Sequence, residues 1–271
     1  MDSKEVRQLS WGNSSIRLDN RLNVKEGFLA NIVQSGNLPK CRLLLILDTE
    51  NGFPGRRGVT FAMTDMKYAA PIRGVNNAYD RKRIGKHNID NWRKWDYAIY
   101  IPRVTAEKWN EFGPYFTLVL GHELEHIRIM LKNLEFHRCV TWLFDDNYKI
   151  FKEAGLDCKS KKKWEFPLEL HCNKQGKRIS EDIFGKTGLV DCLTRLIPHE
   201  TDDHKEYLEF ILKLKDKSQT GHVCENILSD IQKYYHKIEA AVYKVWEIRK
   251  SVGQEFVKQF DLQKFIPLKG E

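Results

Sequence analysis

The sequence predicts an α+β fold, with strands in the N-terminal part of the chain and helices in the C-terminal half. The apolar segments that have the length and residue types of strands all lie before Pro102. After Pro114 the apolar residues recur at helical spacing, and no proline interrupts residues 202–260. The strand-forming and helix-forming residues are thus separated along the chain, which is typical of the α+β class.

The predicted strands follow a polar N-terminal segment in which residues 19–34 could hold a short helix. Residues 41–47 are strongly apolar and predict a buried strand, and residues 59–63 predict a second strand. Tyr97–Ile101 has the composition of a third strand, which Pro102 closes. This third strand could be an edge strand or an ordinary core strand.

Helices are predicted from Pro114 onward, where prolines and glycines mark their ends. The first covers residues 114–132, the second residues 137–154, and the third residues 167–184, before Gly185. Residues 202–260 predict a long two-helix hairpin that is broken at residues 218–221. We therefore expect one domain over residues 1–200 and a helical hairpin over residues 201–271 that packs on the same core.

The composition is that of a globular protein, since 41% of the 271 residues are hydrophobic and 11% are aromatic. The net charge of +8 allows an acidic or nucleic-acid partner but does not require one. The polar N-terminus has no apolar stretch typical of a secretory signal, and the apolar runs are too short to span a membrane. We therefore expect a cytoplasmic protein without a membrane partner.

The 6 cysteines form no CxxC pair. We therefore expect reduced thiols and no cysteine-based zinc site.

The pentapeptide from His122 to His126 is an HExxH motif and predicts a zinc site. Histidines four residues apart lie on the same face of a helix, so both imidazoles can reach one ion. Glu123, beside the first histidine, could take a proton from a water molecule on the metal. The surrounding apolar residues favour the helix that the motif requires. The alternative interpretation is a pair of hydrogen-bonded histidines on a half-exposed helix.

A catalytic zinc ion usually has three protein ligands, so a third ligand must be found. The three-histidine continuation of the motif fails, because Ile129 and Lys132 stand where glycine and histidine are required. Glu169 is the strongest candidate. It shares one helix face with Asn173 and with two small residues, Cys172 and Gly176, which would let this helix approach the histidine helix closely. Asn173, one turn after Glu169, could hydrogen-bond a ligating group.

Other residues are also candidates for the third ligand. His171 and Glu165 lie close to Glu169 in the sequence, and a second group of ligand types falls within residues 198–204: His199, Glu200, Asp203 and His204. The alternative interpretation of this second group is a solvent-exposed helix N-terminus, whose cap and first turn favour acidic residues. His199, His204 or Tyr207 could instead contact the oxyanion of a substrate.

Residues 121–126 and 169–173 together resemble the gluzincin metallopeptidases, and in particular their soluble ImmA/IrrE-like branch. Those enzymes carry HExxH followed by a helix with a Glu, a small residue and an Asp or Asn. The resemblance implies a zincin-like fold, in which a small mixed sheet packs on the HExxH helix. It also implies one Zn²⁺ per chain bound by His122, His126 and Glu169, with Glu123 as general base and Asn173 in hydrogen-bonding support of a ligand.

The activity that this resemblance implies is that of a zinc metalloendopeptidase acting on a protein or peptide substrate, which in this branch is typically a DNA-binding regulator. In zincins, the strand before the HExxH helix can bind an extended peptide by β-augmentation. Three positions depart from the family pattern: His171 replaces a frequent glutamate, Cys172 an alanine and Gly176 a bulkier residue. The likeness covers the two motif helices and the strand before them, so residues 1–90 and 200–271 indicate no subfamily.

Two other classes of function fit parts of the sequence. A basic run at residues 81–86 leads to two tryptophans that flank two basic residues at 92–95, which is compatible with a nucleic-acid-binding or regulatory module on a zincin scaffold with little peptidase activity. A solvated loop with two core tryptophans explains the same residues. The third class is an interaction protein that keeps a silent scaffold and acts through its C-terminal helices.

Overall fold

The structure is a computed structural model of the chain, and it describes residues 6–11, 14–19, 26–36, 41–47, 59–62, 96–101, 110–132, 137, 162–165 and 167–214. The chain divides into two compact units, residues 1–131 with 172–216 and residues 132–171 with 217–271. Three predicted features lie wholly or almost wholly outside the described residues: the basic stretch 81–95, the helix at 137–154 and the hairpin beyond residue 214.

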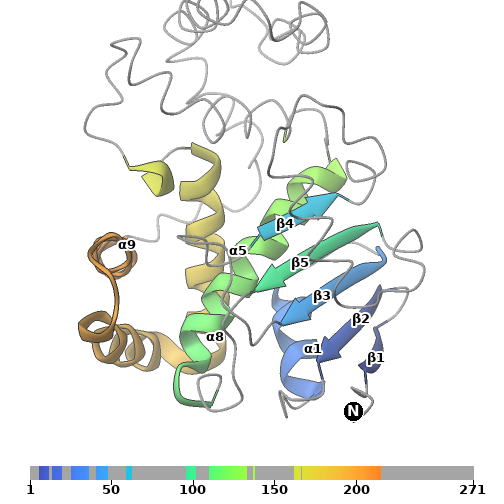
Figure 1. The fold of residues 1–271 in the computed structure, drawn as a ribbon, viewed down its shortest axis with the longest axis horizontal. Coiled ribbons are helices and arrows are strands. Elements are labelled where there is room, and N and C mark those ends of the chain that lie inside the picture. Colours follow the sequence, from blue (N-terminus) through green and yellow to red (C-terminus); the bar gives the residue numbers. More distant parts are fainter. Residues whose placement is uncertain are drawn as a thin grey trace, which may run out of the picture. The chain divides into compact units, whose positions relative to one another are not determined.

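A three-stranded mixed sheet contains the last three described strands before the motif helix (Figure 1). Its strands are β3 (Leu43–Leu47), β4 (Val59–Ala62) and β5 (Tyr97–Ile101), in the order β3-β5-β4. β3 runs parallel to β5, and β4 runs antiparallel to it. The interpretation of Tyr97–Ile101 as a peptide-binding edge strand is therefore wrong, because both of its edges are already paired. It is a core strand, and Ala98, Ile99 and Ile101 are buried.

A two-stranded hairpin and a short helix precede this sheet. The hairpin consists of β1 (Val6–Trp11) and β2 (Ser14–Asp19), and β2 lies beside β3 (Figure 1). The sequence did not predict the hairpin, because its strands mix polar and apolar residues without a sustained pattern. Helix α1 (Glu26–Ser35) overlaps residues 19–34, the segment expected to hold a short helix, and ends one residue beyond it. Its buried side chains, Leu29, Ile32 and Val33, recur at helical spacing.

Helix α5 (Gly113–Lys132) carries the HExxH motif and is buried on nearly every side. Its bounds match the predicted helix closely. Leu118, Leu120, Leu124 and Ile127 are almost completely buried, as expected of a helix that is apolar all round. Burial takes the polar side chains of α5 out of water, which favours a hydrogen-bond or metal partner for each within the protein. The hydroxyl of Thr117 is the exception on this helix, since it has no hydrogen-bond partner among the described residues.

Helix α8 (Pro167–Leu196) is longer than the sequence predicted. Gly185 has φ 75° and ψ 156°, a conformation that glycine adopts readily, and it breaks the helical geometry where the helix was expected to end. A second helical segment follows at once and continues to Leu196. Ser180 donates a hydrogen bond to the carbonyl oxygen of Pro114 at 2.7 Å, which ties α8 to the start of α5.

Helix α9 (Asp202–Lys213) begins at the predicted residue, after the short 3₁₀ turn η5 (Ile197–His199). Its buried side chains are Tyr207, Leu208 and Ile211. The buried ammonium of Lys177, on α8, donates hydrogen bonds to the carbonyl oxygens of Ile211 (2.9 Å) and Leu214 (2.7 Å). Lys177 thus adds a charged donor to two carbonyl groups at the end of α9, where the last carbonyls of a helix lack the usual partners within the helix; that of Ile211 also accepts the backbone N–H of Leu214 at 3.2 Å.

Replacing Lys177 with methionine should loosen the end of α9 from α8. We expect the free energy of unfolding to fall by about 1–3 kcal/mol, because two buried carbonyl groups lose a charged donor. Urea denaturation measures this change. Lys213→Met, at an exposed position on α9, is the matched control and should change stability by less than about 0.5 kcal/mol. Equal effects of the two substitutions would contradict this role of Lys177.

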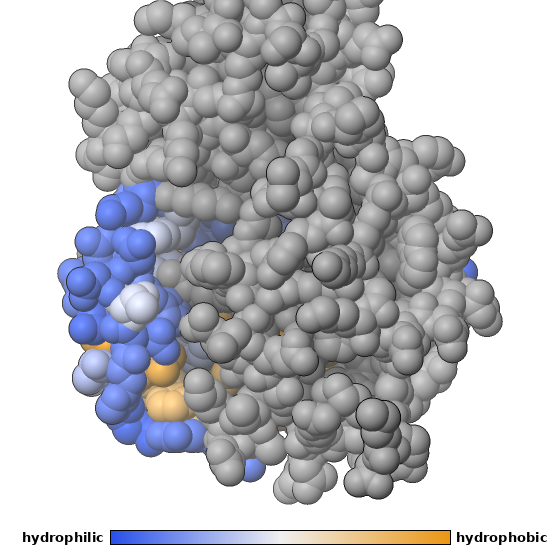
Figure 2. All heavy atoms as spheres, in the orientation of Figure 1, coloured by the Kyte–Doolittle hydropathy of each residue, from blue (hydrophilic) through white to orange (hydrophobic). Residues whose placement is uncertain are grey.

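The described surface visible in Figure 2 is mostly hydrophilic, with few apolar side chains between the polar ones. Among the described residues, Val190 is the one large hydrophobic side chain that is exposed. No helix in the described part of the chain combines the length and the apolar character needed to cross a bilayer.

Candidate metal centre

Helix α5 places the two motif histidines one turn apart with their ring nitrogens facing each other. The Nε2 atoms of His122 and His126 are 3.0 Å apart, and the ring centroids are separated by 4.8 Å. Two nitrogens bound to one tetrahedral zinc ion at about 2.0–2.1 Å lie roughly 3.3 Å apart. The separation between the Nε2 atoms is therefore close to that of a shared ion.

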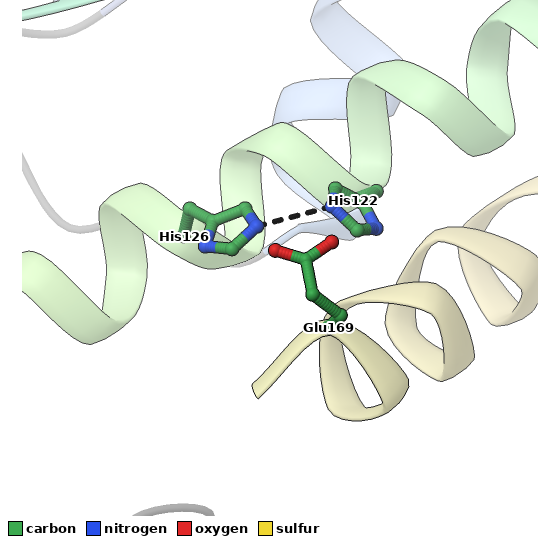
Figure 3. Close-up of side chains that lie close together, drawn as sticks. All are labelled: His122, His126 and Glu169. Atoms are coloured by element: carbon green, nitrogen blue, oxygen red, sulfur yellow. Dashed lines mark hydrogen bonds between the residues drawn. The ribbon is translucent and has the colours of Figure 1, made fainter. Parts of the chain in front are cut away.

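The first turn of α8 brings Glu169 to the same place, and its carboxylate points toward the two rings (Figure 3). A nitrogen of each histidine and a carboxylate oxygen of Glu169 all lie within 4.8 Å of one another. Within the described part of the chain, these three side chains form the one group of His, Cys, Asp and Glu able to hold an ion. Two imidazoles and one carboxylate are the donor set of a catalytic zinc site, which leaves a fourth position for water.

A close crossing of α5 and α8 makes this geometry possible. A Cβ atom added to Gly176 would collide with the carbonyl oxygen of Leu118 and lie 2.9 Å from the backbone nitrogen of His122. On the other helix, a Cβ added to Gly121 would lie 3.1 Å from the Cα atom of Gly176. The two glycines therefore face each other and allow the backbones to touch. Because α8 is helical from Pro167, this contact fixes where Glu169, about two turns earlier, meets the histidines.

Asn173 holds His122 in the form that can bind a metal. The Oδ1 atom of Asn173 lies 2.9 Å from Nδ1 of His122. An amide oxygen only accepts hydrogen bonds, so Nδ1 of His122 carries the proton. In a neutral imidazole the other nitrogen, Nε2, then has a free lone pair, and Nε2 is the atom that faces His126. This is the hydrogen-bonded support that metal-binding histidines commonly have.

Glu123 is buried, with 6% of its surface exposed, and follows the first histidine on α5. In a helix it lies three residues before His126 and thus on a neighbouring part of the same face. Glu125 instead pairs with Arg128 through hydrogen bonds of 2.6 and 2.7 Å. Glu125 is therefore engaged with Arg128 within α5, and Glu123 is the motif carboxylate for which helix geometry gives a position next to the histidines.

The other candidate ligands lie outside the cluster of His122, His126 and Glu169. Glu165 accepts a hydrogen bond from the backbone nitrogen of Lys162 at 2.7 Å. His199 and Asp203 are exposed, at η5 and at the start of α9. His171 is half-buried on α8. Neither His171 nor Glu200 belongs to the group of side chains that could hold an ion.

The structure gives His204 and Tyr207 partners other than a substrate oxyanion. The Nδ1 atom of His204 lies 2.6 Å from a carboxylate oxygen of Glu200, and its Nε2 atom lies 3.2 Å from the hydroxyl of Tyr115. Tyr207 is buried and donates its hydroxyl hydrogen to Asn173 at 3.0 Å. Both nitrogens of His204 are therefore engaged, and Tyr207 lies behind His122, on its Nδ1 side.

Cys41, Cys172 and Cys192, the three cysteines within the described residues, are buried and form no disulfide with one another. Burial raises the pKa of the Cys192 thiol, so this side chain stays protonated at neutral pH. Cys172 lies one turn after Glu169, where a small residue was expected, but it does not belong to the candidate ligand group.

Comparisons of the chain with protein-family models, with curated proteins and with solved structures find no match. The likeness to gluzincins therefore depends on the motif residues and on the geometry that brings them together.

Proposed function

We propose that this protein is a zinc-dependent metallopeptidase of the gluzincin type, which hydrolyses a peptide bond in a protein substrate. The meeting of His122, His126 and Glu169 within 4.8 Å supports this proposal most strongly. Three independent features converge on it: the helical spacing of the histidines, the glycine crossing that admits Glu169, and the hydrogen bond that leaves Nε2 of His122 unprotonated. A pair of hydrogen-bonded histidines on an ordinary helix would need neither the glycine crossing nor the hydrogen bond from His122 to Asn173.

The protein's own residues would have distinct roles in this reaction. His122, His126 and Glu169 would hold one Zn²⁺. When bound, zinc would supply Lewis acidity, which polarises the carbonyl group of the scissile bond and lowers the pKa of a water molecule. Glu123 would accept the proton of that water molecule and deliver it to the leaving amine. Arg128 would keep Glu125 away from the site through its paired hydrogen bonds.

A protein substrate would bind in extended form along a strand edge, as peptides do in β-augmentation. Both edges of β5 are paired, with β3 and with β4. β3 pairs with β5 on one side and has β2 beside it. β4 pairs with β5 alone among the described strands. We therefore assign the role of substrate-binding edge to β4. A DNA-binding regulator remains the substrate class that the resemblance suggests.

Substituting Glu169 by alanine tests the proposed site. Four-ligand structural zinc sites bind with about 10–16 kcal/mol, so one ligand contributes roughly 3 kcal/mol, or about 10²-fold in zinc affinity. We expect this loss in a chelator-competition titration, together with loss of cleavage of a proteome-derived peptide library at limiting zinc. Glu165→Ala removes a nearby carboxylate outside the cluster and should change neither quantity.

Two results would overturn different parts of the proposal. Unchanged zinc affinity in Glu169→Ala would show that the third ligand is another residue. A wild-type protein that binds zinc but cleaves no peptide in the library would contradict peptidase activity and leave a metal-binding protein.

A further inference from the structure

The amide oxygen of Asn173 receives two hydrogen bonds, one from each side. His122 donates through Nδ1 at 2.9 Å, and the hydroxyl of Tyr207 donates at 3.0 Å. Asn173 and Tyr207 are almost completely buried, with 1% and 4% of their surfaces exposed. Helix α9, through Tyr207, is thus connected to the candidate metal ligand His122 by a chain of two hydrogen bonds.

The orientation of the Asn173 amide decides which nitrogen of His122 carries the proton. In the observed orientation the oxygen faces Nδ1, so Nδ1 is protonated and Nε2 can bind a metal. A reversed amide would turn its NH₂ group toward Nδ1, and the His122 proton would then move to Nε2. That tautomer cannot bind an ion through Nε2. A phenol is a better donor than acceptor, so the Tyr207 hydroxyl favours the orientation in which it meets the amide oxygen.

Tyr207 is itself held in place by its neighbours on α9 and α5. The ring of His204 stacks on the ring of Tyr207, with centroids 6.1 Å apart and an angle of 21°. His204 is fixed in turn by Glu200 at 2.6 Å and by the Tyr115 hydroxyl at 3.2 Å. The hydroxyl of Tyr207 therefore has a defined position from which to orient Asn173.

We propose that Tyr207 is a positioning residue of the metal centre, which acts through Asn173 to keep His122 in the tautomer and orientation that bind zinc. This inference rests on the proposed function, since it assigns a role within the same metal site. It gives α9 a part in zinc binding although no residue of α9 belongs to the ligand group.

The substitution Tyr207→Phe removes the hydroxyl and keeps the ring. In the full chain we expect zinc affinity, measured by chelator competition, to fall about tenfold, as is typical when an outer partner of a zinc ligand is lost. Side-chain ¹⁵N NMR of the metal-free protein should show His122 mainly as the Nδ1–H tautomer in wild type and a larger Nε2–H fraction in the variant. Tyr97→Phe, the same change at a buried tyrosine of β5, should leave both measurements unaltered.

A rescue variant separates positioning from general destabilisation. A carboxylate only accepts hydrogen bonds, so Asn173→Asp fixes the Nδ1–H tautomer of His122 without the help of a phenol. Zinc affinity should therefore return to within about threefold of wild type in Tyr207→Phe combined with Asn173→Asp. Failure of this rescue, or an unchanged affinity and tautomer in Tyr207→Phe, would overturn the inference. Absence of zinc binding by wild type would instead contradict the proposed function, and the NMR comparison would still test the link between Tyr207 and His122.

Discussion

Replacing Glu123 with glutamine should abolish most peptidase activity and leave zinc binding intact. Glutamine has nearly the same shape, but it cannot accept the proton of the attacking water molecule. Loss of a general base typically lowers the rate about 10²–10⁴-fold. We expect a decrease of this size in cleavage of the peptide library, with zinc affinity within about threefold of wild type because Glu123 is not one of the ligands.

The matched control for this substitution is Glu209→Gln, which makes the same chemical change at an exposed position of α9. It should retain full activity. Cleavage that persists at the wild-type rate in Glu123→Gln would exclude Glu123 as the general base, even if the zinc site is correct. Loss of zinc together with activity would show that Glu123 acts by supporting the site and not by proton transfer.

Replacing Gly176 with alanine should disrupt the metal centre by pushing α8 away from α5. The added methyl group has no room, because backbone atoms of Leu118 and His122 occupy its position and cannot rotate away. Overpacking of this kind costs typically about 1–3 kcal/mol, and clashes with backbone fall at the upper end or beyond. We expect a loss of about 3 kcal/mol in unfolding free energy. Zinc affinity should fall by at least about 10²-fold as Glu169 moves away from the histidines.

Gly188→Ala, further along the same helix, provides the control for Gly176→Ala. Its new methyl group would meet only Cβ of Phe184 at 3.4 Å, which is close to an ordinary contact. Alanine favours a helix over glycine by up to about 1 kcal/mol, so this variant should be as stable as wild type or slightly more so. Denaturation and zinc titration of both variants provide the comparison. Normal zinc affinity in Gly176→Ala would contradict the requirement for a glycine crossing.

The motif residues could be placed from the sequence because a helix fixes their spacing. His122 and His126 must lie one turn apart in any α-helix, and the apolar residues around them made the helix predictable. Glu169 follows less directly from the sequence, through the small residues about one and two turns after it, Cys172 and Gly176. Gly176 is the more informative of these residues, because a glycine inside a helix is unfavourable and therefore suggests a close approach by another element. The structure shows this approach, since backbone atoms of α5 lie where a Cβ of residue 176 would be. Gly121, its counterpart on α5, carries the same signal.

Features that depend on partners distant in the sequence were not predictable in this way. The residue pattern of Tyr97–Ile101 indicates a strand but does not reveal whether one or two strands pair with it, so it cannot decide between an edge strand and the core strand that β5 is. Likewise, the bond between Tyr207 and Asn173 depends on how α9 packs against α8. Gly185 correctly marked a break in α8, but the immediate return to helical geometry depends on the buried residues beyond it, Leu189, Cys192 and Leu193.

The most direct test of the metal centre is X-ray absorption at the zinc edge on protein loaded with one equivalent of zinc. We predict a shell of nitrogen and oxygen neighbours at about 2.0–2.2 Å, with the multiple-scattering signature of two imidazoles and no sulfur at about 2.3 Å. Such a shell matches binding by His122, His126 and Glu169 together with water. A sulfur neighbour, a single imidazole, or zinc that stays in solution would contradict the assignment of these three residues as the zinc site.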